Sequence, residues 1–574
     1  MPSTSCFHYV ILLFVGAIFS ACQESKPQSN QPVFDITKQV IEDSSMVVSA
    51  HPLATAAGIE ILKKGGNAID AMVAVHFALA VTYPRAGNIG GGGFMIYRDK
   101  NGNTNTLDFR EKAPSSAHRD MYLDNTGQII DSLSLTGPLA SGVPGSVEGM
   151  YAAHQKYGKL PWSTLLQPAI DLADNGIPVS QREADAFNEH MALFKKFNLH
   201  QNAFVKDANW KKGETLLQKD LANVLKRIQT KGRAGFYEGE TADLLVQEMG
   251  KNKGIITHED LKNYNAVWRT PIQFEYQGYN IISMPPPSSG GVCLAELFNM
   301  VEPFPMSEWG FQSAKSIHLF TEAARRAYAD RTEHLGDIDF YPVPVDVLSS
   351  QAYADKRMQD YVDTMATPSD SIRHGNPYPN ESEQTTHYCV VDAEGNAISV
   401  TTTINSNFGS KVIVEGAGFF MNNEMDDFSA KPGVPNQFGL LGNEANAIAP
   451  HKRMLSSMTP TIVEKDGQFF MAVGSPGGSK IITTVFQVVT NVIDYQMPLK
   501  DAVHQPRFHF QWYPDLLYHE EGAFSEQLLD ELKALGHTPQ SRAPIGQVEA
   551  ILRLPNGQLE GVADIRGDDD AQGF

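Results

Sequence analysis

The alternation of apolar and polar residues predicts two β-hairpins in the C-terminal third of the chain. Residues 385–392 are rich in β-branched and aromatic residues, residues 393–396 supply a turn, and residues 397–405 form a second strand. Residues 459–473 repeat the pattern around the dipeptide Asp466-Gly467, which is typical of a two-residue hairpin turn. Further strands are expected at residues 105–109 and within residues 272–283.

Longer segments carry an apolar residue at every third or fourth position, which predicts helices. The segment 68–81 is apolar on all sides, so this helix is expected to lie buried between other layers. Helical segments with charged faces fill most of residues 160–270 and are expected on the outside of the first domain. The other expected helices are residues 51–64, 150–156, 318–330 and 480–494. A chain of 574 residues with this mixture of strands and helices is ordinary for one large α/β unit or for two to three domains.

Composition indicates a soluble globular protein, since 42% of the 574 residues are hydrophobic and 20% are charged. The net charge is −20 and no basic cluster stands out, which argues against nucleic acid and against direct adhesion to anionic lipid. The four cysteines form no CxxC pair and the 17 histidines no HExxH motif. We therefore expect no disulfide framework, no metal site and no cofactor.

The first 21 residues contain no Asp, Glu, Lys or Arg, and residues 9–19 form an apolar run too short for a comfortable membrane span. The run ends in Phe-Ser-Ala-Cys, which resembles a bacterial lipoprotein signal that is cut before Cys22 and lipidated on its thiol. Because the first ten residues lack Lys and Arg, a plain secretory signal cut after Ala21 stays open. We expect a signal peptide at 1–21, a polar linker at 22–45 and a protein anchored at the periplasmic face of a bacterial membrane.

Thr385 is the first candidate catalytic residue. It follows the polar, Pro- and Asn-rich run 375–383, which is typical of an exposed loop. A Thr at the start of a strand, behind a loop that could be cut, can acquire a free α-amine beside its hydroxyl nucleophile. Folding the hairpin also brings Thr403 close to Thr385, because cross-strand neighbours have Cβ atoms about 5 Å apart. Two threonines in a strand can equally reflect β-propensity alone.

Three further motifs could bind an anion, a cation or a developing oxyanion. Arg110 follows a strand, where it is usually a surface charge, although its fork also suits a carboxylate. Glu424 and Asp427 place two carboxylates three residues apart. Gly477 and Gly478 lie between a strand and a helix, where their amides could bind an oxyanion or simply form a tight turn. The glycine run at 90–93 leads into a strand and has no Lys-Ser/Thr, so a phosphate loop is rejected.

The motifs TTHY, TTTIN, NNEMDDFSAKPGVPN, RMLSSMTPTIV and GSPGGSKIITTV occur in this order, after NIGGGGF, LDFREKAP and ASGVPGSV. Together they closely resemble the γ-glutamyltransferase family, over about residues 45–570. The resemblance implies an α+β fold, the αββα four-layer sandwich of an N-terminal-nucleophile hydrolase, which the strand hairpins and flanking helices can accommodate. It also implies a proenzyme that cuts itself between Gln384 and Thr385 into a large subunit (46–384) and a small subunit (385–574), which stay together as a heterodimer.

The resemblance implies γ-glutamyl transfer from glutathione and other γ-glutamyl amides to water, or to acceptor amino acids and dipeptides. It assigns Thr385 as nucleophile and gives supporting roles to residues that match the family motifs. These are Thr403 for the new amine, Gly477 and Gly478 for the oxyanion, Arg110, Ser456 and Ser457 for the donor α-carboxylate, and Asn405, Glu424 and Asp427 for its α-ammonium.

The loop 431–446 is rich in Gly, Pro and Asn and resembles a lid over the site, with Phe438 where many bacterial members have Tyr. Three other functions remain open: a glutaryl- or cephalosporin-type acylase of the same fold, an inactive lipoprotein that binds γ-glutamyl peptides, and a structural envelope protein. The two acids disfavour the acylase, since glutaryl substrates lack an ammonium. The intact Thr385 disfavours the inactive binder.

Overall fold

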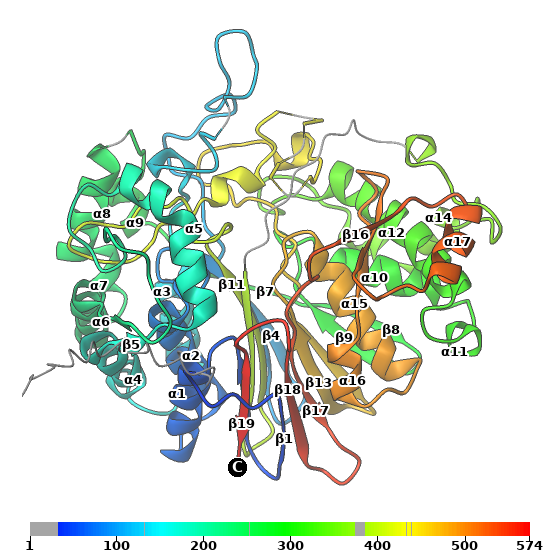
Figure 1. The fold of residues 1–574 in the computed structure, drawn as a ribbon, viewed down its shortest axis with the longest axis horizontal. Coiled ribbons are helices and arrows are strands. Elements are labelled where there is room, and N and C mark those ends of the chain that lie inside the picture. The colour runs from blue at the N-terminus through cyan, green and yellow to red at the C-terminus, as the bar shows by residue number, and fades with distance from the viewer. Residues whose placement is uncertain are drawn as a thin grey trace, which may run out of the picture.

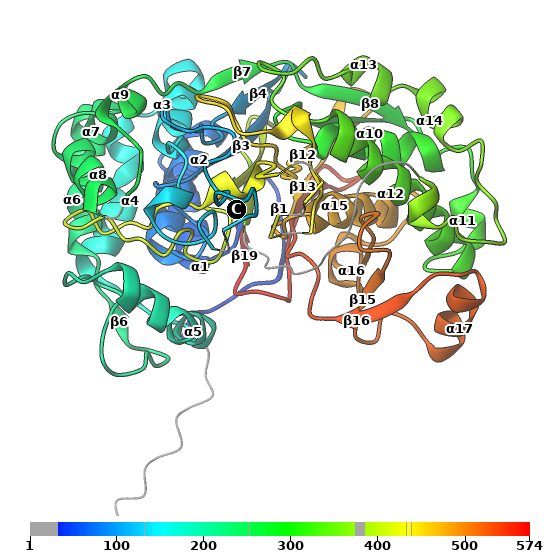
Figure 2. The same cartoon turned by 90° about the horizontal axis from the view of Figure 1, so that it is seen from above.

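The computed structural model describes residues 33–130, 132–251, 253–372, 385–431, 433–434, 436–437 and 439–574. Two seven-stranded antiparallel sheets lie face to face in the middle, and helices cover the outer face of each (Figures 1 and 2). One apolar core fills the space between the sheets and two larger cores lie under the helical layers. This arrangement confirms the α+β class and the αββα sandwich.

The first sheet contains the hairpin that begins after Thr385. Its two strands lie in the interior of the sheet and pair with strands from the N-terminal part of the chain on both sides. The order across this sheet is β19 (Asp570–Gly573), β2 (Met46–Ser49), β10 (Thr386–Val391), β11 (Ala397–Thr403), β3 (Gly92–Arg98), β4 (Thr104–Asp108) and β7 (Val267–Arg269).

The second sheet contains the second expected hairpin, again between strands from other parts of the chain. Its order is β1 (Gln39–Glu42), β18 (Leu559–Ala563), β17 (Glu549–Arg553), β13 (Gln468–Gly474), β12 (Thr461–Lys465), β9 (Tyr279–Ser283) and β8 (Ile272–Tyr276). Asp466 and Gly467 both have positive φ, 50° and 71°, as a type I′ turn requires.

The helices form two layers. On the first sheet lie α1 (Pro52–Lys63), α2 (Ala68–Thr82) and α3 (Ser146–Tyr157), and outside them pack α4 (Trp162–Asn175), α6 (Lys219–Lys231), α7 (Ala234–Tyr237) and α8 (Glu240–Lys251). On the second lie α10 (Gly290–Val301), α15 (Lys480–Ile493) and α16 (Leu499–His504), and α12 (Ala314–His334) and α14 (Gln351–Arg357) pack on α10. The remaining elements are α5 (Gln181–Phe197), α9 (His258–Lys262), α11 (Met306–Trp309), α13 (Val345–Leu348), α17 (Glu526–Ala534), β5 (Ile177–Pro178), β6 (Thr215–Leu216), β14 (Phe508–His509), β15 (Leu517–Glu520) and β16 (Pro539–Arg542), with four short 3₁₀ turns.

All residues of α2 are buried, as its uniform apolarity predicts, and Asn67 caps its N-terminus by accepting from the amide of Asp70 at 3.0 Å. The helix expected at 318–330 is longer at both ends. Ser313 caps the N-terminus of α12, which begins at Ala314 and continues to His334. None of the described helices is long and apolar enough to cross a membrane.

The linker expected at 22–45 is too long at its C-terminal end. Residues 39–42 form β1, which pairs with β18 along its whole length. This edge strand is half-polar, with burial alternating weakly, so its sequence Gln-Val-Ile-Glu gives only a faint strand pattern. Pairing with a distant strand determines its structure, and that contact is not visible locally in the sequence.

Candidate active site

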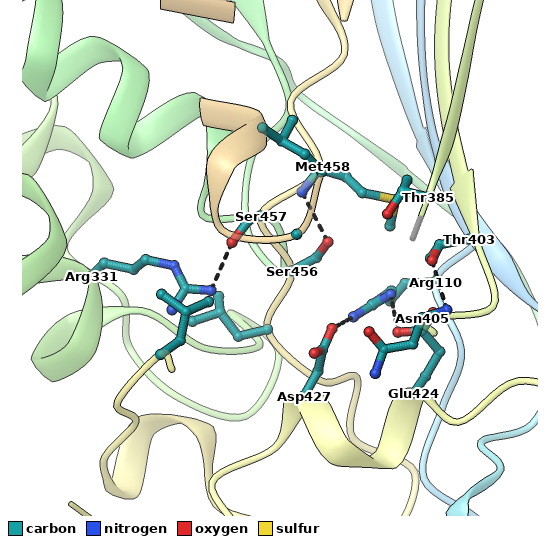
Figure 3. A pocket seen from close by; sticks show the side chains of 14 residues that line it. Arg110, Arg331, Thr385, Thr403, Asn405, Glu424, Asp427, Ser456, Ser457 and Met458 are labelled. Atoms are coloured by element: carbon teal, nitrogen blue, oxygen red, sulfur yellow. Dashed lines mark hydrogen bonds and ion pairs between the residues drawn. The ribbon is translucent and has the colours of Figure 1, made fainter. Parts of the chain in front are cut away.

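Thr385 lies at the N-terminal end of β10, in the wall of a pocket of about 300 Å³ (Figure 3). Only 6% of its surface is exposed. The pocket brings together most of the site residues expected from the sequence, although they come from distant segments. Its lining is Arg110, Arg331, Thr385, Thr403, Asn405, Glu424, Asp427, Leu440, Leu455, Ser456, Ser457, Met458, Gly478 and Ile481.

The hairpin register places a second hydroxyl beside Thr385. Thr386 pairs with Thr402, so Thr385 and Thr403 are the next pair outward. The Thr403 hydroxyl accepts from the amide of Asn405 at 2.7 Å, and Asn405 has a left-handed φ of 71° (Figure 3). The expected proximity of the two threonines is therefore present in the fold.

Gly477 and Gly478 lie between β13 and α15. Their φ values are 136° and 54°, a region that favours glycine, so a side chain at either position would strain the turn. Within the described residues, neither of the two amides donates a hydrogen bond. Gly478 lines the pocket beside Thr385. The turn can thus present backbone N–H groups to an anion at this position.

Arg110 is not a surface charge but is 1% exposed at the bottom of the pocket. It follows β4, and its Nη1 lies 2.6 Å from Glu424 Oε2, while its Nη2 donates to Asp427 (Figure 3). Both acids come from one 3₁₀ turn, Glu424–Asp427. The sequence suggested two separate charge clamps, whereas here they form one buried ion-pair cluster, because an unpaired buried charge is costly.

Glu111 adds a third acid, with its Oε2 3.6 Å from Arg110 Nη1, and burial raises its pKa to about 8. Burial also raises the pKa of Glu424 well above its ordinary value, and that of Asp427, although Arg110 opposes both shifts. Three acids around one guanidinium favour a proton on one of the acids in this cluster. A ligand cation that bound there would displace this proton.

The opposite wall carries the serines and an arginine that sequence reasoning missed. The Ser457 hydroxyl accepts from Arg331 Nη2 at 3.1 Å, and Arg331 Nε donates to Ser289 at 2.9 Å (Figure 3). The Ser456 hydroxyl accepts from the Met458 amide at 3.1 Å. Arg331 lies one residue beyond the helix expected at 318–330, and its single charge among several others in this helix gave no signal of a pocket.

Several expected functional positions lie outside the described residues: Cys22, Gln384 and Phe438. Around Phe438, described parts of the loop do contact the site. Leu440 lines the pocket, Asn436 Nδ2 donates to Asp427 at 3.4 Å, and the Gln437 amide donates to Asp426 at 3.0 Å. These contacts bring residues 436, 437 and 440 close to the acids and the pocket.

One group of described side chains has the spacing of metal ligands: His200, Glu248 and Glu415. The ammonium group of Lys251 contacts both carboxylates, at 3.0 Å from Glu248. A cation of the protein itself therefore occupies the position that a metal would take.

Comparisons with known proteins agree with the geometry. The family model for gamma-glutamyltranspeptidase matches residues 54–574. A glutathione hydrolase proenzyme of Escherichia coli (strain K12) is 48% identical over 568 residues, which cover 98% of this chain and 97% of that protein. The acylase ACY 1 proenzyme of Pseudomonas sp. (strain V22) is 37% identical over 531 residues, covering 91% and 92%.

Two solved structures, one of a gamma-glutamyltranspeptidase and one of a cephalosporin acylase, also resemble this chain. Gamma-glutamyltranspeptidase of Helicobacter pylori is 46% identical with a TM-score of 0.56, covering 59% of this chain and 97% of that chain. Cephalosporin acylase from Bacillus halodurans is 25% identical with a TM-score of 0.80, covering 97% and 99%. The match over residues 54–574 and the high identity over nearly the whole chain establish that this protein belongs to the gamma-glutamyltranspeptidase family and is an enzyme.

Proposed function

We propose that this chain is a proenzyme that cuts itself between Gln384 and Thr385 and then transfers γ-glutamyl groups. The donors are glutathione and other γ-glutamyl amides, and the acceptors are water, amino acids or short peptides. One observation carries the proposal. Thr385 directly precedes the interior strand β10 and lies in the wall of a pocket. The same pocket holds a guanidinium and two carboxylates, the groups that suit the zwitterionic end of a γ-glutamyl donor.

Self-cleavage requires only groups at the start of β10. The Thr385 hydroxyl attacks the carbonyl of Gln384, the peptide C–N bond breaks, and the acyl group passes from nitrogen to oxygen. Water then hydrolyses the ester and leaves a free α-amine on Thr385. With an ordinary pKa of about 7.7–8.0, this amine is neutral often enough near pH 8 to act as a base.

In turnover the Thr385 amine takes the proton of the hydroxyl, and the oxygen attacks the γ-carbonyl of the donor. The amides of Gly477 and Gly478 stabilise the oxyanion, while Thr403 positions the amine. The proton passes to the leaving nitrogen, and a γ-glutamyl ester remains on Thr385. Water or an amine then attacks this ester and releases the product.

Donor recognition exchanges one set of ion pairs for another. The α-carboxylate of the donor binds Arg110 with Ser456 and Ser457. Its α-ammonium meanwhile binds Asn405 and the two acids Glu424 and Asp427. These acids exchange their ion pairs with Arg110 for ion pairs with the ammonium. A donor that carries both charges thus leaves no buried charge unpaired.

The two fragments are expected to stay together because both sheets mix strands from each. The small subunit (385–574) would contribute β10, β11 and β19 to the first sheet, and the large subunit (46–384) β2, β3, β4 and β7. The second sheet combines β12, β13, β17 and β18 with β8 and β9 in the same way. Separating the subunits would break both sheets, which supports a stable heterodimer.

We also propose export to the periplasmic face of a bacterial membrane, with an anchor on Cys22. The apolar run at 9–19 and the Phe-Ser-Ala-Cys in which it ends support this proposal. The E. coli and H. pylori relatives are bacterial proteins, which is consistent with a bacterial envelope.

A gel of the purified protein tests the proposal. The wild type should give two bands of about 40 and 21 kDa, at the mean residue mass of a 574-residue chain of 63.0 kDa, and the smaller should begin Thr-Thr-His-Tyr. Thr385→Ala should give one folded, inactive band, since alanine has no oxygen to start the acyl shift. Thr386→Ala is the matched control. It removes a neighbouring buried hydroxyl for which the described residues offer no hydrogen-bond partner, and it should still be cut. A small subunit with any other N-terminus would falsify the mechanism.

A further inference from the structure

A second pocket, of about 470 Å³, also has Thr385 in its wall. Gly477 lines this pocket, whereas Gly478 lines the first, so the glycine turn and the threonine together separate the two spaces. We call it the cationic pocket, because its lining includes three arginines and no carboxylate. The lining is Tyr83, Arg85, Arg182, Thr385, Pro476, Gly477, Pro544, Gly546, Gln547 and Arg566.

Arg85 is the unusual group in this wall. Only 8% of its surface is exposed. Among the described residues, its guanidinium donates one hydrogen bond, from Nη2 to the Tyr83 hydroxyl at 2.5 Å, and lies 4.5 Å from the centre of the Tyr83 ring. Its Nε has no partner, and within the described residues no carboxylate lies at ion-pair distance from it. A guanidinium has five N–H donors, so most of the capacity of this buried cation is unused.

The other two arginines of this pocket differ in whether a carboxylate pairs with them. Arg566 is held by Glu520, with Nε 2.7 Å from Oε1, and by Asp564, so it serves as a fixed wall. Arg182 is exposed at the start of α5, and its Nη1 donates to the backbone carbonyl of Arg566. Among the described carboxylates, none pairs with Arg182. Two of the three cations are therefore available to an anion.

Acids near this pocket do not cancel that charge. Glu183 is 4% exposed, and burial raises its pKa to about 8 although Arg85 opposes the shift, so it is mostly protonated at pH 7. Asp568 is close enough to influence Arg85 but lies outside the lining and beyond ion-pair distance. At neutral pH the cationic pocket thus attracts anions.

We propose that the cationic pocket binds the amine-side peptide, both as leaving group and as acceptor, and that Arg85 and Arg182 hold its C-terminal carboxylate. The inference rests on the proposed γ-glutamyl transfer. The first pocket accommodates the acyl half of the donor, so the nitrogen that leaves Thr385 or attacks its ester must lie in the adjoining space. In transfer, the amine nitrogen bonds to the γ-carbonyl carbon, the bond from that carbon to Thr385 Oγ breaks, and the amine proton passes through the Thr385 α-amine to Oγ.

The ligand class follows from the spacing of these groups. Its nitrogen must reach Thr385 while its carboxylate reaches a guanidinium in the same pocket, which suits an amino acid or dipeptide with a free C-terminus. An amide at that C-terminus would remove the anion and leave the rest of the ligand unchanged.

The test measures how the γ-glutamyl enzyme divides between water and an added acceptor. With γ-glutamyl-p-nitroanilide as donor and fully processed protein, the ratio of transfer product to free glutamate is determined for glycylglycine and for glycylglycinamide. Each acceptor concentration is corrected for the fraction with a free amine. We expect the wild type to favour glycylglycine about tenfold or more, the size of one charge-assisted hydrogen bond. Arg85→Gln and Arg182→Ala should each bring this preference towards one.

The control is Lys195→Ala, which removes an exposed charge from the same helix as Arg182, outside the pocket, and should keep the wild-type preference. If Arg85→Gln is not processed, Arg182→Ala decides alone, because that side chain is exposed. A wild type that releases no nitroaniline overturns the proposed function and the subsite with it. A wild type that releases nitroaniline but uses both acceptors equally, or variants that retain the preference, overturn the subsite alone.

Discussion

The sharpest consequence of the Arg110 cluster concerns which donors the enzyme accepts. Arg110 pairs with Glu424 and Asp427, so a donor carboxylate that binds Arg110 competes with these two acids. A γ-glutamyl donor compensates the acids with its α-ammonium. A glutaryl donor has the same carboxylate but no ammonium, and it leaves two buried acids without their cation.

The size of this effect follows from the contact that is lost. A hydrogen bond to a charged group contributes about 1.5–3 kcal/mol, and breaking a buried charge pair costs more than that. We therefore expect kcat/KM for γ-glutamyl-p-nitroanilide to exceed that for glutaryl-p-nitroanilide by a factor on the order of 10². Asp427→Asn should lower the first value and raise the second, because the neutral amide needs no cation.

The assay is the release of nitroaniline from the two donors by wild type, Asp427→Asn and Ser456→Ala. Ser456→Ala is the control, since its hydroxyl is proposed to bind the carboxylate that both donors share. It should slow both reactions and leave their ratio unchanged. Equal wild-type rates would refute the reasoning and favour an acylase, as would an Asp427→Asn ratio identical to that of the wild type.

Three further predictions follow from the same structure and sequence. Cys22→Ser should abolish labelling by a radioactive fatty acid, and an unlabelled wild type beginning at Cys22 would contradict the anchor. Burial raises the pKa of Glu424, and the proposed contact with the donor ammonium requires its ionised form. As the pH is lowered, kcat/KM should therefore fall more steeply in wild type than in Glu424→Gln, and equal slopes on the acid side would contradict this. Asp564 is buried, yet Arg507 and Arg566 lower its pKa from 3.8 to about 2. It should stabilise the fold by about 2 kcal/mol above pH 4, and this contribution should be lost as pH falls towards 2. Asp564→Asn should therefore lower Tm more at pH 7 than at pH 2.5, and equal losses would show that its charge is irrelevant.

The parts of the fold that sequence could predict are those determined by local pattern. Asp466-Gly467 and the alternation around it locate the hairpin of β12 and β13, and the uniform apolarity of residues 68–81 identifies a helix buried on all sides. The register between Thr385 and Thr403 follows from hairpin geometry, since the turn at Gly395 determines every pair above it. Such features depend on neighbours within about 20 residues in the chain.

The parts that sequence could not predict depend on contacts between distant segments. Arg331 reaches the pocket because α12 packs against α10, and nothing in its helix distinguishes it from Arg325 or Arg326, which are also buried. The direct pairing of Arg110 with Glu424 bridges more than 300 residues. Motif matching suggested Arg110 and Glu424 as ligands for a substrate. Only the fold shows that these two side chains also form an ion pair with each other.

The position of Thr385 accounts for how the proposed cleavage and the proposed catalysis can share one residue. β10 is an interior strand, bonded on one side to β2 and on the other to β11, so its N-terminal end is held in place before the bond to Gln384 is cut. Cutting that bond removes no strand from either sheet. The new amine consequently appears at a fixed point between the two pockets, beside Thr403 and the glycine turn. Precise placement of a nucleophile and base of this kind supplies much of the advantage of intramolecular reactions, so the stability of the sheet itself contributes to the rate.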